Sequence, residues 1–242
     1  MGSAGTATPE GAALNLTRRL FAAAAALLMV SPAAAAPQKK ASDWTRTVVV
    51  TPDGGFRMGN PMAKVRLIEY GSLTCPRCRQ FAETGNAPLI AYVKSGKVSF
   101  EYRNYVLNSI DIAASLVARC GGTQRFFPIV DKLYATQPDW VGKIVNLSSA
   151  EKQRLTELAD GPRMVRLAEV GGIKSLAATH GLPAAQADKC LADTAAMSRL
   201  EQMVEKGRSF GVEGTPTFFV NGIKVNASDW PSLEPFIKRA AG

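Results

Sequence analysis

The stretch that decides the fold is EYGSLTCPRCRQF, residues 69–81. It places Cys75 and Cys78 three positions apart, with Pro76 and Arg77 between them. A polar turn precedes the two cysteines and a helical pattern follows them. Such a pair can serve as metal ligands, as a structural disulfide or as a reactive redox site, so the rest of the chain has to distinguish these chemistries.

The residues around this motif predict a βαβ unit. Residues 65–71 have the apolar content of a buried strand, and residues 97–106 have that of a second one. Between them a helix begins near Pro76, where proline is tolerated because the first helical N–H groups have no partner within the helix. We expect this helix to extend toward Val93, with a kink or break at residues 86–88, where a proline falls.

Further strand signals lie near both ends of the chain. Residues 45–51 are rich in β-branched side chains and are followed by the hairpin turn signal Asp-Gly-Gly at 53–55. Residues 217–220 and 223–225 predict a second hairpin, because the Asn-Gly pair between them favours a type I′ turn.

Residues 108–210 predict a block of helices inside the chain. Apolar side chains recur at helical spacing, and Ser148 with Glu151 forms a capping box. Pro183 and Asp193 are expected to open two further helices of the block. The predicted order is therefore a βαβ unit, a helical insert, a β-hairpin and a final helix.

The N-terminus has the pattern of a secretory signal peptide, over residues 1–36. Arg18 and Arg19 form a basic region, and residues 20–30 are apolar but too short to span a bilayer. The arginine pair also fits a twin-arginine signal, so the general and the twin-arginine export routes both stay open. Residues 37–43 are polar and predict a flexible arm, and we expect the mature protein in the periplasm.

Composition limits the classes of protein further. The chain has 242 residues, of which 46% are hydrophobic, so it can build a core without relying on its four cysteines. The formal net charge is +9, but the basic residues are scattered among acidic ones. We interpret this charge as solvation with mild steering, and expect no nucleic-acid partner for an exported protein.

The metal interpretation lacks ligands. A structural zinc site needs four, usually from a second Cys-x-x-Cys or a histidine pair. This chain has one histidine, His180, and Cys120 and Cys190 stand alone in the sequence. We therefore expect no metal, and interpret His180 as a helix-end or surface residue.

A redox site explains the position of the pair better than an inert disulfide does. Cys75 would lie at a helix N-terminus, where unpaired N–H groups and the helix dipole favour negative charge. A thiolate is the charged form of a thiol, so the pKa of Cys75 should fall, with Arg77 adding a fixed positive charge. A stabilised thiolate makes the corresponding disulfide a stronger oxidant.

Two motifs resemble one known family. GNPMAKVRLIEYGSLTCPRC, residues 59–78, is similar to the active-site region of bacterial DsbA-type thiol:disulfide oxidoreductases, and FGVEGTPTFFVNG, residues 210–222, resembles their second signature. The resemblance covers about residues 44–242.

The resemblance implies an α/β thioredoxin fold, with a mixed sheet flanked by helices and a large inserted helical domain. Residues 44–107 and 211–242 would form the thioredoxin-like domain, and residues 108–210 the insert.

The same resemblance implies roles for the residues of the motif. Cys75 would be the exposed nucleophile that forms a mixed disulfide with a client, and Cys78 the buried partner that resolves it. Pro76 and Arg77 would tune the redox potential. Many family members carry histidine where this chain has Arg77, whose charge should not depend on pH.

Three more site residues follow from the resemblance. Pro216, after Thr215, would be a cis-proline that faces the disulfide and offers an extended edge to client peptides, although a plain strand entry with a trans bond is the alternative. Glu69 would be a buried proton acceptor or relay for Cys78. A strand-end carboxylate paired with a base explains Glu69 equally well.

Cys120 and Cys190 fall on apolar helix faces in the insert. Two buried free cysteines are one explanation, because cysteine behaves as a small hydrophobe. We favour a second, structural disulfide, which the resemblance to some alphaproteobacterial members of the family implies.

The resemblance predicts an enzyme that introduces disulfides into exported proteins, without a cofactor, and that a quinone-linked membrane oxidase of the DsbB type reoxidises. Threonine before the proline is shared with isomerases and reductases, which leaves the direction open. Too few residues precede the first strand for a dimerisation domain, so we expect a monomer. A hypothesis of another class is a client-binding chaperone whose disulfides are only structural.

Overall fold

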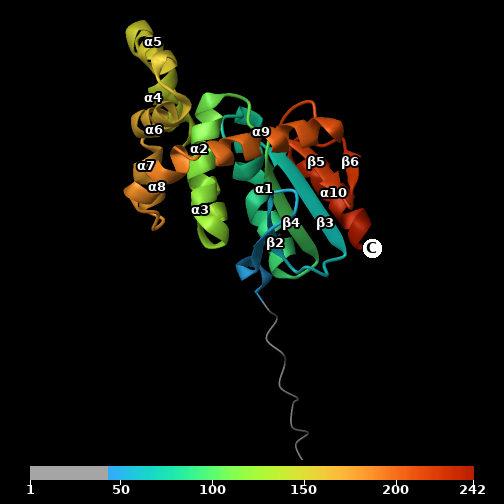
Figure 1. Ribbon diagram of the computed structural model, residues 1–242. Helices are drawn as coiled ribbons and strands as arrows, with labels where there is room; N and C mark the ends of the chain where they lie inside the picture. The colour runs from blue at the N-terminus through green and yellow to red at the C-terminus, as the bar shows by residue number, and fades with distance from the viewer. Residues whose placement is uncertain (1–42) are drawn as a thin grey trace, which may run out of the picture. The chain divides into compact units, whose positions relative to one another are not determined.

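A single mixed sheet organises the chain in the computed structural model, which describes residues 43–242 (Figure 1). The strand order in the sheet is β1-β2-β4-β3-β5-β6, in which β3 and β4 are parallel and every other neighbouring pair is antiparallel. The strands are β1 (Val48–Val50), β2 (Phe56–Gly59), β3 (Val65–Gly71), β4 (Val98–Asn104), β5 (Thr217–Val220) and β6 (Ile223–Val225). The predicted signal peptide and all but the last residue of the predicted arm lie outside the described residues.

Helix α1 (Pro76–Lys94) connects the two parallel strands. Pro76 is its first residue and Cys75 its N-cap, as the sequence predicts. Of the kink or break expected at residues 86–88, the break is wrong, because α1 runs through Pro88 to Lys94. A proline inside a helix costs about 3 kcal/mol. The buried side chains of Phe81, Leu89 and Val93 offset this cost, since each large apolar side chain contributes about 1.5–3 kcal/mol on burial.

The first strand is shorter than the β-branched run predicts. Residues Trp44–Arg46 form a 3-10 turn, and only Val48–Val50 belong to β1. The carboxylate of Asp43 accepts hydrogen bonds from the backbone N–H and the hydroxyl of Thr45, and this local bonding competes with strand pairing.

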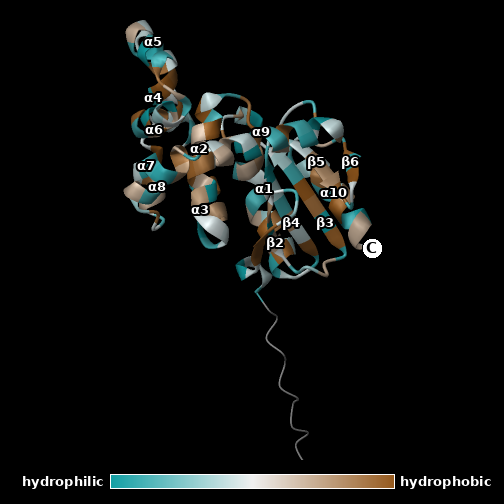
Figure 2. Cartoon of the chain, in the orientation of Figure 1, coloured by the Kyte–Doolittle hydropathy of each residue, from teal (hydrophilic) through white to brown (hydrophobic). Residues whose placement is uncertain are grey.

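The two faces of the sheet are covered by different helices. Helices α1 and α10 (Trp230–Ala241) contact one face, where Phe81 lies 4.6 Å from Phe218 between ring centroids. Helix α9 (Thr194–Ser209) contacts the other face, where Tyr70 and Phe219 belong to a second apolar cluster. Because successive strand residues point to opposite faces, Glu69 and Tyr70 lie on different sides of the sheet. Figure 2 shows hydrophobic residues on β3 and β4, and also on helices of the insert such as α2 and α3.

The insert between β4 and β5 is helical throughout. Its helices are α2 (Ser109–Cys120), α3 (Gly122–Ala135), α4 (Gln137–Val145), α5 (Ser149–Glu157), α6 (Asp160–Val170), α7 (Ile173–Ala178), α8 (Ala184–Leu191) and α9. The capping box of Ser148 and Glu151 and the cap formed by Asp193 are present as predicted. The arrangement is the predicted thioredoxin fold with a helical insert. No helix within residues 43–242 has the length and apolar character needed to cross a membrane.

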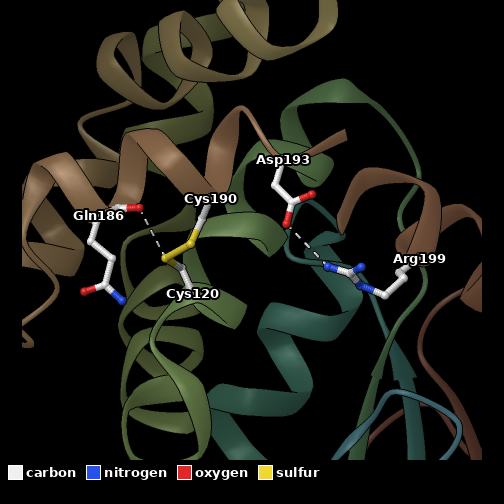
Figure 3. Close-up of a disulfide and its surroundings, with 5 residues drawn as sticks. All are labelled: Cys120, Gln186, Cys190, Asp193 and Arg199. Carbon is white, nitrogen blue, oxygen red and sulfur yellow. Dashed lines mark hydrogen bonds and ion pairs between the residues drawn. A yellow bond between two sulfur atoms is a disulfide. The ribbon is translucent and has the colours of Figure 1, made fainter. Parts of the chain in front are cut away.

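A disulfide between Cys120 and Cys190 joins α2 to α8 (Figure 3). It is the pair that the resemblance implies, and it closes a sequence separation of 70 residues. Asp193, three residues after Cys190, caps α9 and contacts Arg199. The bond therefore ties α2 to α8 just before the point where α9 begins.

Replacing both cysteines in the variant Cys120→Ser/Cys190→Ser should lower the unfolding free energy by about 2–4 kcal/mol, because the unfolded chain gains the entropy of an open loop. Urea unfolding of the oxidised wild-type protein and of the variant measures the difference. Equal midpoints for the two proteins would show that the disulfide does not stabilise the fold.

Candidate active site

The two cysteines of the motif lie side by side at the start of α1 as free thiols. Cys75 is the N-cap, and Cys78 lies in the first turn, where its side chain is fully buried. Residue Cys75 is 8% exposed, and its sulfur lies 3.2 Å from the carbonyl oxygen of Thr215. The site thus has an outer and an inner thiol, and segments more than 130 residues apart meet at the outer one.

The environment separates the pKa values of the two thiols. A hydrogen bond from Cys78 lowers the pKa of Cys75 to about 5, with further contributions from the Thr215 side chain and from the backbone N–H groups of Cys78 and Arg77, against the opposing effect of burial. Burial and the bond to Cys75 raise the pKa of Cys78 well above its usual value. Cys75 is therefore the thiolate at neutral pH, and Cys78 remains protonated and donates to it.

Arg77 acts differently from the sequence prediction. Its side chain is exposed, and its contribution to the low pKa of Cys75 comes from the backbone N–H rather than from the guanidinium charge. Pro76 is exposed beside it. The two residues form the outer surface next to Cys75.

Thr215 and Pro216 face the thiols from the loop before β5. The peptide bond between them is cis, so the alternative of a trans proline does not hold in this structure. The Thr215 hydroxyl is buried and has no hydrogen-bond partner among the described residues. It is therefore available to donate to the Cys75 thiolate. The Thr215 carbonyl and hydroxyl both lie at the reactive sulfur.

Glu69 is buried on β3, on the face that α1 covers. Burial, with smaller contributions from the nearby charges of Cys75 and Asp131, raises the pKa of its carboxyl to about 8. No salt bridge within residues 43–242 involves Glu69, so the alternative of a carboxylate paired with a base finds no support. The carboxyl is mostly protonated at neutral pH, and it disfavours the Cys78 thiolate when it ionises.

A small cavity adjoins Glu69. It has a volume of about 20 Å³, which is room for roughly one water molecule. Tyr102, Tyr134 and Asp131 contribute to its wall, and burial raises the pKa of Asp131 to about 6. Polar and titratable groups thus surround the inner end of the site.

The structure adds three site residues that the sequence interpretation missed. Asp111, Tyr134 and Gln137 come from three helices of the insert, and each makes a hydrogen bond to the loop between β3 and α1. Asp111 is a charged residue on the buried face of α2, which is a signal visible in the sequence. Nothing in the sequence marks Tyr134 or Gln137.

The remaining candidates lie elsewhere. The Cys120–Cys190 disulfide belongs to the insert. His180 lies in the turn after α7, and within the described part of the chain no three His, Cys, Asp or Glu side chains gather as a metal site.

Comparison with known proteins agrees with this geometry. The family model described as thioredoxin matches residues 51–239. The chain belongs to the thioredoxin family. A crystal structure of a protein-disulfide isomerase from Novosphingobium aromaticivorans has 31% sequence identity and a TM-score of 0.71, and the match covers 77% of this chain and 96% of that one.

More distant relatives extend the comparison. A Rickettsia bellii protein, provisionally named a protein-disulfide oxidoreductase, is 26% identical over 188 residues, which cover 76% of this chain and 63% of the relative. This member of the thioredoxin family therefore spans a little under two thirds of that relative's length. Wolbachia pipientis alpha-DsbA1 shares the fold, with a TM-score of 0.65 at 19% identity over 79% of this chain and 92% of that one. The predicted thioredoxin fold and membership of the thioredoxin superfamily are confirmed.

Replacing Glu69 by Gln should change how stability depends on pH. The folded pKa of Glu69 lies above its unfolded value, so its favourable contribution is complete below about pH 4.5 and is lost as the pH rises through about 8. Over that window the wild-type unfolding free energy should lose up to roughly 1.4 kcal/mol per pH unit relative to the variant. The Glu69→Gln protein should then be the more stable one at pH 8.

Chemical unfolding of both proteins between pH 4 and pH 9 measures this difference. The matched control is Glu205→Gln, at an exposed carboxylate whose ion pair with Arg208 lies on the surface. Parallel pH profiles for wild type and Glu69→Gln would contradict the raised pKa.

Proposed function

We propose that the chain is a periplasmic thiol:disulfide oxidoreductase that introduces disulfides into exported proteins by exchange through Cys75 and Cys78. The observation that supports this most is the separation of the two pKa values: a thiolate at Cys75 beside a buried, protonated Cys78. Groups with separated pKa values are typical of sites where one group reacts and the other exchanges a proton.

The reaction begins from the oxidised site. A client thiolate attacks the sulfur of Cys75, the bond from Cys75 to Cys78 breaks, and Cys78 leaves with the electron pair and takes up a proton. A second client thiolate then attacks the client sulfur of the mixed disulfide, and Cys75 leaves as a thiolate. The client has lost two electrons and gained a disulfide, and both cysteines are reduced. Because the sulfur atoms carry the electrons, the exchange needs no cofactor.

Each site residue has a role in this scheme. Cys75 is a good leaving group because its thiolate is stabilised, which also favours oxidation of the client. Burial disfavours the thiolate form of Cys78, so this sulfur needs a proton when it leaves. The protonated carboxyl of Glu69 supplies that proton and later takes it back. Thr215 and Pro216 offer an extended edge to the client backbone beside the attacked sulfur.

Location and partners belong to the same proposal. The N-terminal sequence pattern supports export, and the oxidised state would be regenerated by a quinone-linked membrane oxidase of the DsbB type. The clients are reduced exported proteins, and the protein acts as a monomer.

A second candidate is disulfide isomerase or reductase activity at the same site. The relative from Novosphingobium aromaticivorans, which is named an isomerase, favours it. An isomerase would rearrange a scrambled client without net oxidation, whereas an oxidase consumes its own disulfide once per client bond. The chaperone hypothesis has less support, because a purely structural pair gives no reason for the low pKa of Cys75.

The test uses a reduced model client and the oxidised protein. Cys75→Ser should abolish client oxidation, because it removes the attacked sulfur. Cys78→Ser is tested with a client that already carries a disulfide. The Cys75 thiolate attacks that disulfide and releases one client thiolate, and without Cys78 the mixed disulfide accumulates as a larger species on a non-reducing gel. The matched control is the Cys120→Ser/Cys190→Ser variant, which keeps the active pair. Unchanged oxidation by the Cys75→Ser protein would rule out the proposal.

A further inference from the structure

The loop between β3 and α1, residues 72–75, carries Cys75, the outer of the two thiols. Within the loop, the N–H of Cys75 donates to the Ser72 carbonyl at 3.2 Å and that of Thr74 to the Ser72 hydroxyl at 3.2 Å. The hydroxyls of Ser72 and Thr74 also lie 3.2 Å apart. The N–H and the carbonyl of Leu73 find no partner inside the loop. Buried backbone groups need hydrogen-bond partners. The residues that bond to the Leu73 N–H and carbonyl therefore determine what holds the loop in place.

Both bonds come from the helical insert. The carboxylate of Asp111 on α2 accepts from the Leu73 N–H at 2.9 Å and from the Ser72 hydroxyl at 2.5 Å. It also accepts from the N–H of Leu107 at 3.0 Å, which ties the segment between β4 and α2 to the same carboxylate. Asp111 is fully buried, and its ionised form only accepts hydrogen bonds, as its donor neighbours require.

Gln137, the first residue of α4, holds the other side of the loop. Its side-chain amide donates to the Leu73 carbonyl at 2.8 Å and to the Cys75 carbonyl at 3.0 Å. The Cys75 carbonyl also accepts from the N–H of Arg79, the first bond of α1, whereas the Leu73 carbonyl has Gln137 alone among the hydrogen bonds of the described residues. One buried amide therefore joins the loop to the point where α1 begins.

A third helix completes the attachment. The Tyr134 hydroxyl on α3 donates to the Ser72 carbonyl at 3.1 Å and lies 2.7 Å from the Tyr102 hydroxyl. A hydroxyl has one hydrogen, so Tyr102 donates to Tyr134. The loop is thus bonded by α2, α3 and α4 together.

We infer that Gln137 and Asp111 are positioning residues, through which the insert sets the reactivity of Cys75. This inference rests on the proposed redox role of Cys75. The N–H groups of Arg77 and Cys78 stabilise the thiolate only while the Cys75 sulfur stays in front of them, and that geometry depends on the peptide that Gln137 holds. In addition, the donating amide reduces the negative potential of a carbonyl close to the thiolate.

Gln137→Met is the variant that tests this role. Methionine is also unbranched and of similar length, but it cannot donate to either carbonyl. We expect the pKa of Cys75 to rise by at least half a unit, measured as thiolate absorbance near 240 nm in the reduced protein. We also expect the equilibrium constant for oxidation of glutathione by the Cys75–Cys78 disulfide to fall at least threefold.

Ile144→Val is the matched control. Ile144 is buried on the same helix and makes no hydrogen bond to the loop, so this variant loses packing without touching the positioning contacts. It should lower the melting temperature and leave both redox measurements unchanged. If Gln137→Met does not fold, Asp111→Asn replaces it, with the same two redox shifts expected. An amide has one acceptor oxygen and cannot accept all the bonds from Ser72, Leu73 and Leu107.

The outcomes are distinct. A wild-type protein without a reactive, low-pKa thiol would refute the proposed function itself. The positioning role alone would be overturned in two cases, both with a reactive wild-type protein. In one, Gln137→Met folds and keeps the wild-type pKa of Cys75 and the wild-type equilibrium constant with glutathione. In the other, Ile144→Val shifts these two quantities as much as Gln137→Met does.

Discussion

The central interaction is that of the Cys75 sulfur with hydrogen-bond donors at the start of α1. Cys78 provides a thiol, and the first turn provides N–H groups that have no partner within the helix. Together they outweigh the cost of partial burial and lower the pKa of Cys75 to about 5. Burial also acts on Cys78, where it outweighs a lowering contribution from the Ser72 backbone, and on Glu69, and it raises the pKa values of both groups. One helix end therefore creates the asymmetry on which the exchange chemistry depends.

The rest of the fold keeps that helix end in place. The parallel pairing of β3 with β4 brings Glu69 beneath α1, and β5 brings Thr215 and the cis-proline against the sulfur. The insert is attached at the same point, through the hydrogen bonds of Asp111, Tyr134 and Gln137 to the loop before Cys75. A helical region about one hundred residues long thus has a direct connection to the reactive group, in addition to covering the core.

Short sequence patterns predicted the helix starts, helix caps and turns, because these features depend on residues that are neighbours in the chain. The start of α1 at Pro76, the caps at Ser148 and Asp193 and the turn at Asn221 all follow from short patterns. The cis-proline and the second disulfide needed the family resemblance, because spacing alone does not pair distant residues. The contacts of Gln137 could not be predicted, since they join segments more than 60 positions apart. The break predicted near Pro88 failed because tertiary burial outweighed a local preference.

The most direct test is the redox potential of the Cys75–Cys78 pair, measured by equilibration with glutathione in the Cys120→Ser/Cys190→Ser background so that one pair titrates. A thiolate stabilised at the helix start stabilises the reduced state, which predicts a potential well above that of thioredoxin, about −270 mV. A potential at or below that value would mean that the site is a reductant or a stable disulfide, and the stabilised thiolate would not be the basis of an oxidase.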